Sequence, residues 1–346
     1  MRAAVKVDAS PQLVLRDEPQ PQCDRDEALV KMRFAGLCGT DVAIRNNSFM
    51  GRHGPVKPPL IPGHEFCGEV VEVGPAVTKL RVGDRVTSSG IKGCGGCYAC
   101  KTGLYHRCRQ WIHVGIDIPG CFAEYAAMSQ DILFTLPDGI PDDEATVLEP
   151  LATAVRAFRT NDIAPNSFVV ILGPGPFGLF ILQAAAASAP GRVVMVGLSS
   201  DRERMALARR LGAYELIEAD RTDPVKEVEA LTHGKGADLV IEATGRVEAV
   251  TQAIRMTGAG GLCLMGGSGF QGKLVSFEPW NVVRDEKRIK GLQGLTWADY
   301  LLALDLYAAG KIQIAPVISH RLPLEEVNQA CLLAEQRRAV KIVLRP

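Results

Sequence analysis

The chain has 346 residues, so two domains are expected, because a single hydrophobic core stops growing at roughly 250 to 300 residues. Lysine plus arginine equals aspartate plus glutamate at 39 each, which argues against a general binder of nucleic acid or anionic membranes, since such proteins need an excess of positive charge. The N-terminal residues lack an apolar signal-peptide core, and no run reaches the roughly 18 apolar residues of a membrane span, so a cytoplasmic location without a membrane partner is expected.

The first 150 residues are rich in short β-like runs that glycine and proline interrupt, for example at 28–32, 68–73 and 85–86. This spacing is typical of a small barrel or sandwich. From about residue 151 to 290, apolar strands alternate with helical patterns, at 168–172, 176–187, 192–198, 201–211, 238–244 and 261–265. Such alternation predicts βαβ units around a parallel sheet, so the fold class is α/β. The segment 291–346 is expected to add helices near 297–309 and 324–335 and a strand at 340–344.

Four of the ten cysteines are grouped within fifteen residues, at Cys94, Cys97, Cys100 and Cys108. Grouped cysteines in a chain without an export signal are more often a metal site than a disulfide framework. Four thiolates satisfy tetrahedral Zn²⁺ and leave no open position, which predicts a structural zinc. Free thiols, an iron–sulfur cluster and a nucleic-acid zinc ribbon are the alternatives. The ribbon is disfavoured because two separated cysteine pairs and a surrounding basic cluster are missing.

A second set of potential metal ligands is dispersed along the first domain. Cys38, His64, Glu65 and Glu149 offer a thiolate, an imidazole and carboxylates, which suit a catalytic zinc with a position left for substrate. Each residue alone has an ordinary structural explanation, and spacing alone cannot join positions so far apart. The residues by themselves therefore leave a second metal site open.

The strand predicted at 168–172 is followed at once by Gly173-Pro174-Gly175-Pro176-Phe177-Gly178 and then by an alanine-rich helix. A glycine-rich turn between a strand and a helix predicts a dinucleotide-binding loop. The first glycine makes the turn, the second lets the backbone approach the pyrophosphate, and the third allows close helix–strand packing. Pro176 suits the first helical turn, and Phe177 follows it. Thr244, at the end of the strand predicted at 238–244, is a further expected cofactor-binding residue.

Together these motifs resemble the medium-chain dehydrogenase/reductase superfamily, most closely its zinc-containing polyol (sorbitol-like) and threonine dehydrogenase branches. The resemblance spans essentially the whole chain and follows the family's order. The residues that carry it are Gly36-Leu37-Cys38-Gly39-Thr40-Asp41, the run 63–70, Gly83-Asp84-Arg85-Val86, the four-cysteine lobe, Glu149-Pro150 and the glycine loop.

This resemblance implies a GroES-like catalytic domain over 1–150, a doubly wound Rossmann domain over 151–290 and a return segment over 291–346 that completes the catalytic domain. It implies a catalytic zinc held by Cys38, His64 and Glu65, with Glu149 beside the metal or exchanging with Glu65. Joint ligation by His64 and Glu65 requires a bent backbone, because adjacent strand residues point to opposite faces. Two zinc ions per chain are therefore expected.

The resemblance also implies an activity, the transfer of a hydride between a secondary alcohol and NAD(P). The substrate would be a polyol, sugar, cyclitol or hydroxy-amino acid. Thr40 would bond the reacting oxygen and start proton transfer to solvent. Many relatives carry a histidine three residues later, where this chain has Ala43, and His53 is a possible substitute. A non-catalytic zinc- and dinucleotide-binding protein is the alternative function, and the complete set of four catalytic-site residues argues against it.

Cofactor preference departs from the simplest expectation. NAD-specific sites carry an acid about 20 residues past the glycine loop, but counting from Gly178 reaches Gly197. The small or basic residues that follow could accept a 2′-phosphate, and we predict no strict NAD specificity and a slight preference for NADP. Asp201 could oppose this by binding the ribose. The residues expected to contact the phosphate are Ser199, Ser200, Arg202 and Arg204.

Assembly is the last expectation that the resemblance implies. Relatives pair the edges of their Rossmann sheets, so a homodimer or homotetramer is predicted. The edge is expected at the strand 261–265 and the segment that follows it to Phe277.

Overall fold

The computed structural model describes residues 1–188 and 191–346, which form two compact units. Unit 1 contains Met1–Pro150, Gly294–Tyr300 and Ile318–Pro346, and unit 2 contains Leu151–Gln293 and Leu301–Val317. The predicted return segment 291–346 is thus divided between the units. A physical reason for this division lies at Gln313, whose backbone N–H donates to the Gln183 side chain (2.7 Å) and whose carbonyl accepts from it (3.1 Å).

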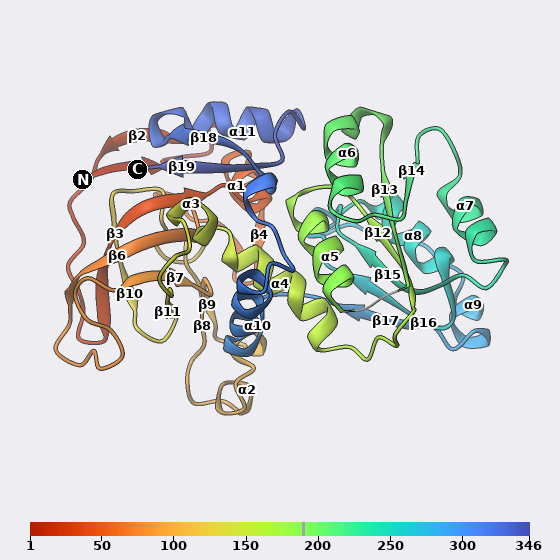
Figure 1. Cartoon of the computed structure of the whole chain (residues 1–346). Helices are drawn as coiled ribbons and strands as arrows, with labels where there is room; N and C mark the ends of the chain where they lie inside the picture. The colour runs from red at the N-terminus through yellow and green to blue at the C-terminus, as the bar shows by residue number, and fades with distance from the viewer. Residues whose placement is uncertain (189–190) are drawn as a thin grey trace. The chain divides into compact units, whose positions relative to one another are not determined.

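Unit 1 is built on a seven-stranded sheet with the order β11-β7-β6-β3-β19-β18, in which β10 also pairs with β3 (Figure 1). Three two-stranded ribbons, β1–β2, β4–β5 and β8–β9, complete its β structure. The prediction of a β-rich first domain is therefore confirmed. The strands are β1 (Arg2–Val5), β2 (Val14–Asp17), β3 (Glu27–Gly36), β4 (Met50–Gly51), β5 (Gly54–Pro55), β6 (Glu65–Val73), β7 (Arg85–Ser88), β8 (Ile91–Lys92), β9 (Ile112–His113), β10 (Tyr125–Ser129), β11 (Leu133–Thr135), β18 (Ile318–Pro323) and β19 (Lys341–Arg345).

Strand β19 joins distant parts of the sequence, because it lies between β3 and β18 in this sheet. Val343 faces Gly36 across the β3–β19 ladder. The core beneath the sheet buries Val30, Phe66 and Phe122 almost completely. The helices of this unit are α1 (Gly39–Arg45), α2 (Tyr98–Lys101), η1 (Tyr105–Arg107), α3 (Asp142–Ala145), η4 (Leu324–Glu326) and α11 (Val327–Glu335). Two of the boundaries between the units fall within helices, namely α4 (Leu148–Arg159) and α10 (Trp297–Ala308).

Unit 2 is a doubly wound domain around a six-stranded sheet with the order β14-β13-β12-β15-β16-β17, in which every pairing is parallel. Helices α5 and α6 pack against β12, β13 and β14, and α7 and α8 pack on the core that contains Val170 and Val240 (Figure 1). Its elements are β12 (Phe168–Leu172), α5 (Pro176–Ala187), β13 (Arg192–Gly197), η2 (Ser199–Asp201), α6 (Arg202–Arg210), β14 (Glu215–Glu218), α7 (Pro224–Leu231), β15 (Ala237–Glu242), α8 (Val247–Met256), β16 (Thr257–Met265), α9 (Pro279–Arg284), β17 (Arg288–Gly291) and η3 (Ala315–Val317).

The predicted sheet edge at 261–265 is wrong. These residues belong to β16, which is paired on both sides, by β15 and by β17. The edge on this side of the sheet is β17, whose alternation of Arg288 and Lys290 with Ile289 is too short to mark a strand in the sequence. Among the helices of residues 1–188 and 191–346, none combines the length and the apolar character that a membrane crossing requires.

Candidate active site

Cys38, His64 and Glu65 converge in unit 1, where their ligand atoms all lie within 4.8 Å of one another. Cys38 is the N-cap residue of α1, and Glu65 is the first residue of β6. His64 precedes the strand and follows Gly63, whose φ of +93° turns the chain. The bend that joint ligation requires is thus provided before β6 begins, so strand alternation does not separate the two side chains.

Asp41 holds two of these ligand segments together. Its carboxylate is fully buried and accepts hydrogen bonds from the backbone N–H groups of Cys38 (2.8 Å) and Gly63 (3.1 Å). Nδ1 of His64 lies 3.8 Å from Oδ1 of Asp41. A carboxylate behind a histidine orients the ring and increases its basicity, which is the usual arrangement around metal-binding histidines.

Glu65 has a buried cationic partner, Lys341 of β19. The Lys341 ammonium contacts Oε2 of Glu65 and donates to the carbonyl oxygen of Leu37 (2.9 Å). Burial alone would lower the pKa of Lys341, but Glu65 and Cys38 together raise it above its ordinary value, so the side chain stays charged. Gly36 makes room for this carboxylate, because a β-carbon at Gly36 would lie 2.4 Å from Oε2 of Glu65.

The electrostatics of this cluster suit a cation. Burial favours a neutral His64, yet Asp41 and Cys38 are so close that the pKa of His64 rises to about 10. Nδ1 of His64 is buried without a hydrogen-bond partner, and the ion pair with Lys341 is the contact that Oε2 of Glu65 makes. One thiol, one imidazole and one carboxylate are donors that zinc prefers, so the residues present fit this ion.

Glu149, the fourth predicted residue, lies near this cluster but outside the group of converging ligand atoms. Removal from water raises the pKa of Glu149 to about 7, although the charge of His64 lowers it. Glu149 therefore lies close enough to interact with His64 and Glu65, and its role beside a metal stays a prediction.

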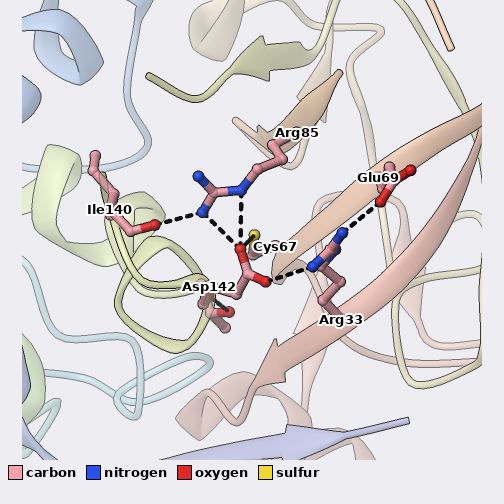
Figure 2. A network of polar contacts seen from close by, with 7 residues as sticks. Arg33, Cys67, Glu69, Arg85, Ile140 and Asp142 are labelled. Carbon is pink, nitrogen blue, oxygen red and sulfur yellow. Dashed lines mark hydrogen bonds and ion pairs between the residues drawn. The ribbon is translucent and has the colours of Figure 1, made fainter. Parts of the chain in front are cut away.

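A polar network secures the segment that leads to Glu149 (Figure 2). Asp142, the first residue of α3, accepts hydrogen bonds from Arg85 (2.6 and 3.0 Å) and Arg33 (3.0 Å). The thiol of Cys67 lies 3.5 Å from the same carboxylate. Figure 2 shows how Arg85, from the Gly83–Val86 motif, also reaches the carbonyl oxygen of Ile140. Strands β3, β6 and β7 thereby fix the start of the helical segment that continues into α4.

Thr40, Ala43 and His53 are the residues that the sequence suggests for the proton path. Thr40 lies in the first turn of α1, two residues after Cys38, and its side chain is partly exposed. Ala43 lies one turn further along the helix and cannot carry a proton. His53 is exposed, and its Nε2 is bonded to the carbonyl oxygen of Trp111 (2.7 Å).

The four-cysteine lobe also converges, with all four sulfur atoms within 4.8 Å of one another. Cys108 is buried, and its sulfur accepts from the backbone N–H groups of Cys94 (3.4 Å) and Gln110 (3.3 Å). Hydrogen bonds from the backbone lower the pKa of Cys94 to about 6, whereas desolvation raises that of Cys100 to about 12. Four sulfurs this close, with no histidine or carboxylate among them, fit a closed tetrahedral site.

In unit 2, the glycine loop has the geometry that its motif predicts. A β-carbon at Gly173 would lie 2.8 Å from the Thr244 side chain, and one at Gly178 would lie 1.9 Å from the carbonyl oxygen of Gly173. Gly175 has open space at its β-carbon position and caps α5, which begins at Pro176, with Phe177 next. The loop therefore exposes backbone at the helix N-terminus, where phosphates bind.

The residues after β13 differ in their availability. Ser199 donates from its backbone to Asp220 (2.7 Å) and from its hydroxyl to the same carboxylate. Asp201 is buried, accepts from the backbone of Leu198 (3.2 Å) and lies 3.7 Å from Arg204, so it is not turned toward solvent. Ser200 and Arg202 are exposed.

Three structural partners were missed by sequence reasoning. Lys341 could have been recognised as a buried charge, because it is the one charged residue in the otherwise apolar run from Ala339 to Leu344. Asp220 could not have been recognised from the sequence, since only the β13–β14 pairing brings it to Ser199. Glu242 is a buried carboxylate that accepts from the backbone of Thr244 (2.6 Å) and Gly245 (2.8 Å) beside the glycine loop.

Two family models match the chain. The alcohol dehydrogenase GroES-like domain matches residues 24–138, and the zinc-binding dehydrogenase model matches residues 176–309. L-threonine 3-dehydrogenase of Bacillus licheniformis is 36% identical over 355 residues, covering 100% of this chain and 99% of the relative. Sorbitol dehydrogenase of Halalkalibacterium halodurans is 32% identical over 348 residues, with 100% and 99% covered.

Solved structures agree with these matches. The crystal structure of a zinc-binding dehydrogenase from Sinorhizobium meliloti, bound to NADP, superposes with a TM-score of 0.89. It is 30% identical, and the match covers 100% of this chain and 99% of that one. The similarity therefore extends over both units.

Proposed function

Because the chain belongs to the zinc-containing medium-chain dehydrogenase/reductase superfamily, in its polyol and threonine dehydrogenase branch, we propose that it oxidises a secondary hydroxyl of a polyol, sugar, cyclitol or hydroxy-amino acid. The hydride goes to NAD(P). The observation that carries this proposal is the convergence of Cys38, His64 and Glu65, whose ligand atoms all lie within 4.8 Å of one another.

In this proposal Cys38, His64 and Glu65 hold the catalytic zinc, and Glu149 is the nearby carboxylate that can exchange with Glu65. Zinc bound there supplies a Lewis acid that lowers the pKa of the substrate hydroxyl. Asp41 holds the backbone of Cys38 and of Gly63, next to His64, in position, and Lys341 restrains the Glu65 carboxylate. The nicotinamide ring supplies the hydride acceptor, while the protein positions both partners.

Thr40 takes part by accepting the hydroxyl proton in a hydrogen-bonded exchange and passing it toward solvent. Its partly exposed position, two residues from Cys38, supports this role. Ala43 cannot continue the relay, so the proton leaves through water or another group. The structure gives no support to His53 as that group, since its Nε2 is already bonded to Trp111.

We further propose a second, structural zinc at Cys94, Cys97, Cys100 and Cys108, which gives two zinc ions per chain. For the dinucleotide, Gly173, Gly175, Pro176, Phe177, Gly178 and Thr244 form the binding loop. A slight preference for NADP rests on Ser200 and Arg202, which are exposed, with weaker support from Ser199 and Arg204, which have acidic partners. A homodimer or homotetramer is the proposed assembly.

A cofactor-reduction screen tests the proposed activity. The purified, zinc-loaded protein is mixed with NAD⁺ or NADP⁺ and a panel of polyols, sugars, cyclitols, hydroxy-amino acids and simple alcohols at alkaline pH. We expect reduction with at least one member of the first four classes. Cys38→Ser and His64→Ala should abolish turnover with dinucleotide binding near normal, and Thr40→Val should lower turnover with a smaller loss of zinc. Retained turnover in a fully zinc-free variant would refute the proposed chemistry.

A further inference from the structure

Unit 2 contains a surface cavity of about 630 Å³ that the proposed chemistry does not use. Part of its wall comes from the amino ends of three neighbouring strands, namely the loop 234–236 before β15, residues 257–259 that begin β16, and Lys287 before β17. The glycine loop follows the carboxyl end of β12 in the same parallel sheet. The cavity therefore lies at the opposite end of the sheet from the dinucleotide loop. Its volume is within the range of about 300–1,000 Å³ that is usual for small-molecule sites.

Close backbone packing holds two sides of this cavity in place. A β-carbon at Gly236 would lie 2.6 Å from the α-carbon of Gly258, and one at Gly258 would lie 2.4 Å from the carbonyl oxygen of Lys235. Only glycine permits this approach, so Lys235 is held against the first residues of β16. On the other side, the N–H of Gly260 donates to the carbonyl oxygen of Asp285 (2.7 Å), which fixes the segment before β17 to β16.

A buried ammonium group lies in the wall of the cavity. The side chain of Lys287 is only 8% exposed, and its Nζ donates to the carbonyl oxygen of Ile254 (3.3 Å). Its acidic partner is Asp285, 3.5 Å away, but both oxygens of that carboxylate accept hydrogen bonds from Arg284 (2.7 and 3.1 Å). One carboxylate thus serves two cations, whereas a buried lysine is normally fully paired. An anionic ligand would compensate the positive charge that remains.

Two further cationic side chains line the cavity, those of Lys235 and Arg255. In the part of the chain that the structure describes, neither side chain makes an ion pair or a hydrogen bond. Glu229 and Glu278 are the acidic residues of the lining besides Asp285. Four cationic side chains are therefore opposed by three carboxylates, and the lining has a surplus of positive charge.

The rest of the lining suits an organic group attached to the anion. Ile254 and Met256 are buried apolar residues of α8, and the side chain of Phe277 is 42% exposed. An aromatic ring with this exposure offers a face on which an apolar or planar group can stack. A bare inorganic anion would leave this apolar part of the wall without a contact.

We propose that this cavity binds a small organic phosphate, in which a phosphate monoester is attached to an apolar or aromatic group. A phosphate monoester carries a charge of about −1.5 to −2 at pH 7, which matches the two unpaired cations Lys235 and Arg255 better than a single carboxylate does. The guanidinium of Arg255 can bind it through two parallel hydrogen bonds. No residue assigned above to a zinc site or to the dinucleotide lines the cavity, so the inference goes beyond the proposed function and does not depend on it.

Isothermal titration calorimetry of the zinc-loaded protein with phenyl phosphate tests this proposal. Saturating NADH is present, because it fills the dinucleotide site without itself carrying a phosphate monoester. We expect saturable binding at one site per chain. Benzoate, which carries a single charge on the same ring, should bind about tenfold more weakly or worse, because it makes fewer charge-assisted hydrogen bonds.

Four variants locate the binding site. Arg255→Gln and Lys235→Gln should each weaken phenyl phosphate about tenfold, because each removes a charge-assisted hydrogen bond. Glu229→Gln should tighten it, since a carboxylate in the lining repels the phosphate. Lys226→Gln, on α7 but outside the lining, is the matched control and should leave the dissociation constant unchanged. All four side chains are exposed, so these changes leave the fold intact.

Absence of saturable binding to the wild type, or equal dissociation constants for wild type and Arg255→Gln, would overturn the proposal. Equal affinities for phenyl phosphate and benzoate would also overturn it, because the site would then not select a phosphate. The titration needs no turnover, so a protein that oxidises no alcohol would refute the proposed function without changing this result.

Discussion

Lys341 is a buried lysine in contact with a candidate metal ligand, and removing it should affect the zinc-free and zinc-loaded protein differently. Lys341→Met leaves the Glu65 carboxylate buried without its cation, which should cost about 3 kcal/mol or more in the zinc-free protein. Zinc can neutralise the same carboxylate, so the loss in the zinc-loaded protein should be smaller. Thermal unfolding with zinc and with a chelator measures both values.

Linkage then requires that Lys341→Met bind zinc more tightly at the catalytic site than wild type does. Lys341→Arg is the matched control, because it keeps the positive charge. An equal loss of stability with and without zinc would show that Lys341 does not compete with the metal for Glu65.

Asp220 provides a second prediction for a single residue. Its carboxylate bonds Ser199, and that hydrogen bond is the main cause that lowers the pKa of Asp220, so a negative charge lies beside the expected 2′-phosphate position. Asp220→Asn should raise the NADP-to-NAD ratio of kcat/KM by about tenfold. Arg202→Gln should lower it. If the wild type prefers NAD by more than about a hundredfold, roughly 2.7 kcal/mol, the preference for NADP is refuted.

The convergence of the candidate metal ligands could be predicted from the family motifs, whereas the contacts made by several of their neighbours could not. Cys38, His64 and Glu65 are found in motifs of fixed spacing. Asp220 reaches Ser199 only through the pairing of two strands, and the His113 ring reaches that of His64 only through the β8–β9 ribbon. Such contacts depend on tertiary pairing, which neither periodicity nor local spacing encodes.

At the level of elements, Asp142 secures the helical segment α3–α4 to strands β3 and β7. Burial would raise the pKa of Asp142, but Arg85 and Arg33 lower it overall. The ionised carboxylate therefore stabilises the fold at pH values above the pKa of an unfolded-state aspartate, about 4. Asp142→Asn should destabilise by about 2 kcal/mol at pH 7. The difference from wild type should shrink as the pH falls through the folded-state pKa. Chemical denaturation from pH 7 to pH 3 measures this; a difference that is constant with pH would contradict it.

The four-cysteine lobe is the second element with a defined test. Cys100→Ser should release about one zinc per chain and lower the stability of unit 1, because binding and folding are coupled. The loss should be about 4 kcal/mol when free zinc exceeds the dissociation constant a thousandfold. Zinc analysis and melting temperature measure the effect. Cys23→Ser, outside the lobe, serves as the control, and an unchanged zinc content in Cys100→Ser would remove the structural assignment.

Element prediction worked best where apolar periodicity was long. Strand β12 and helix α5 have the predicted bounds, 168–172 and 176–187. Their apolar pattern is visible in the local sequence, without knowledge of which segments they pack against. Strand β17 was missed, because four residues with two charges carry no clear period. Its existence depends on β16, which offers an apolar neighbour and free backbone groups.

For the whole molecule, the unpaired side of β17 is the expected assembly surface. Trp280 and Val283 on the preceding helix α9 are 61% and 65% exposed, which is unusual for such apolar side chains. Light scattering at micromolar concentration should give a dimer or tetramer. Val283→Glu should shift it to a smaller species, since a buried unpaired charge is costly. Val82→Glu, at an equally exposed position in unit 1, should leave the oligomeric state unchanged. A monomeric wild type would refute the proposed assembly.

The position of β19 between β3 and β18 has a consequence for the order in which the protein can fold on the ribosome. Synthesis proceeds at about 5–20 residues per second, so residues 1–150 wait for roughly 10 to 40 seconds before residues 341–345 are made. Until then the Ala35–Gly36 end of β3 lacks its β19 neighbour, and Glu65 has no ammonium to offset its charge. The nucleotide-binding unit, whose sheet is complete by residue 291, can close first. A nascent chain therefore carries an exposed strand edge and an incomplete metal cluster for most of its synthesis. This strand edge is the surface that a chaperone would have to shield from aggregation during that interval.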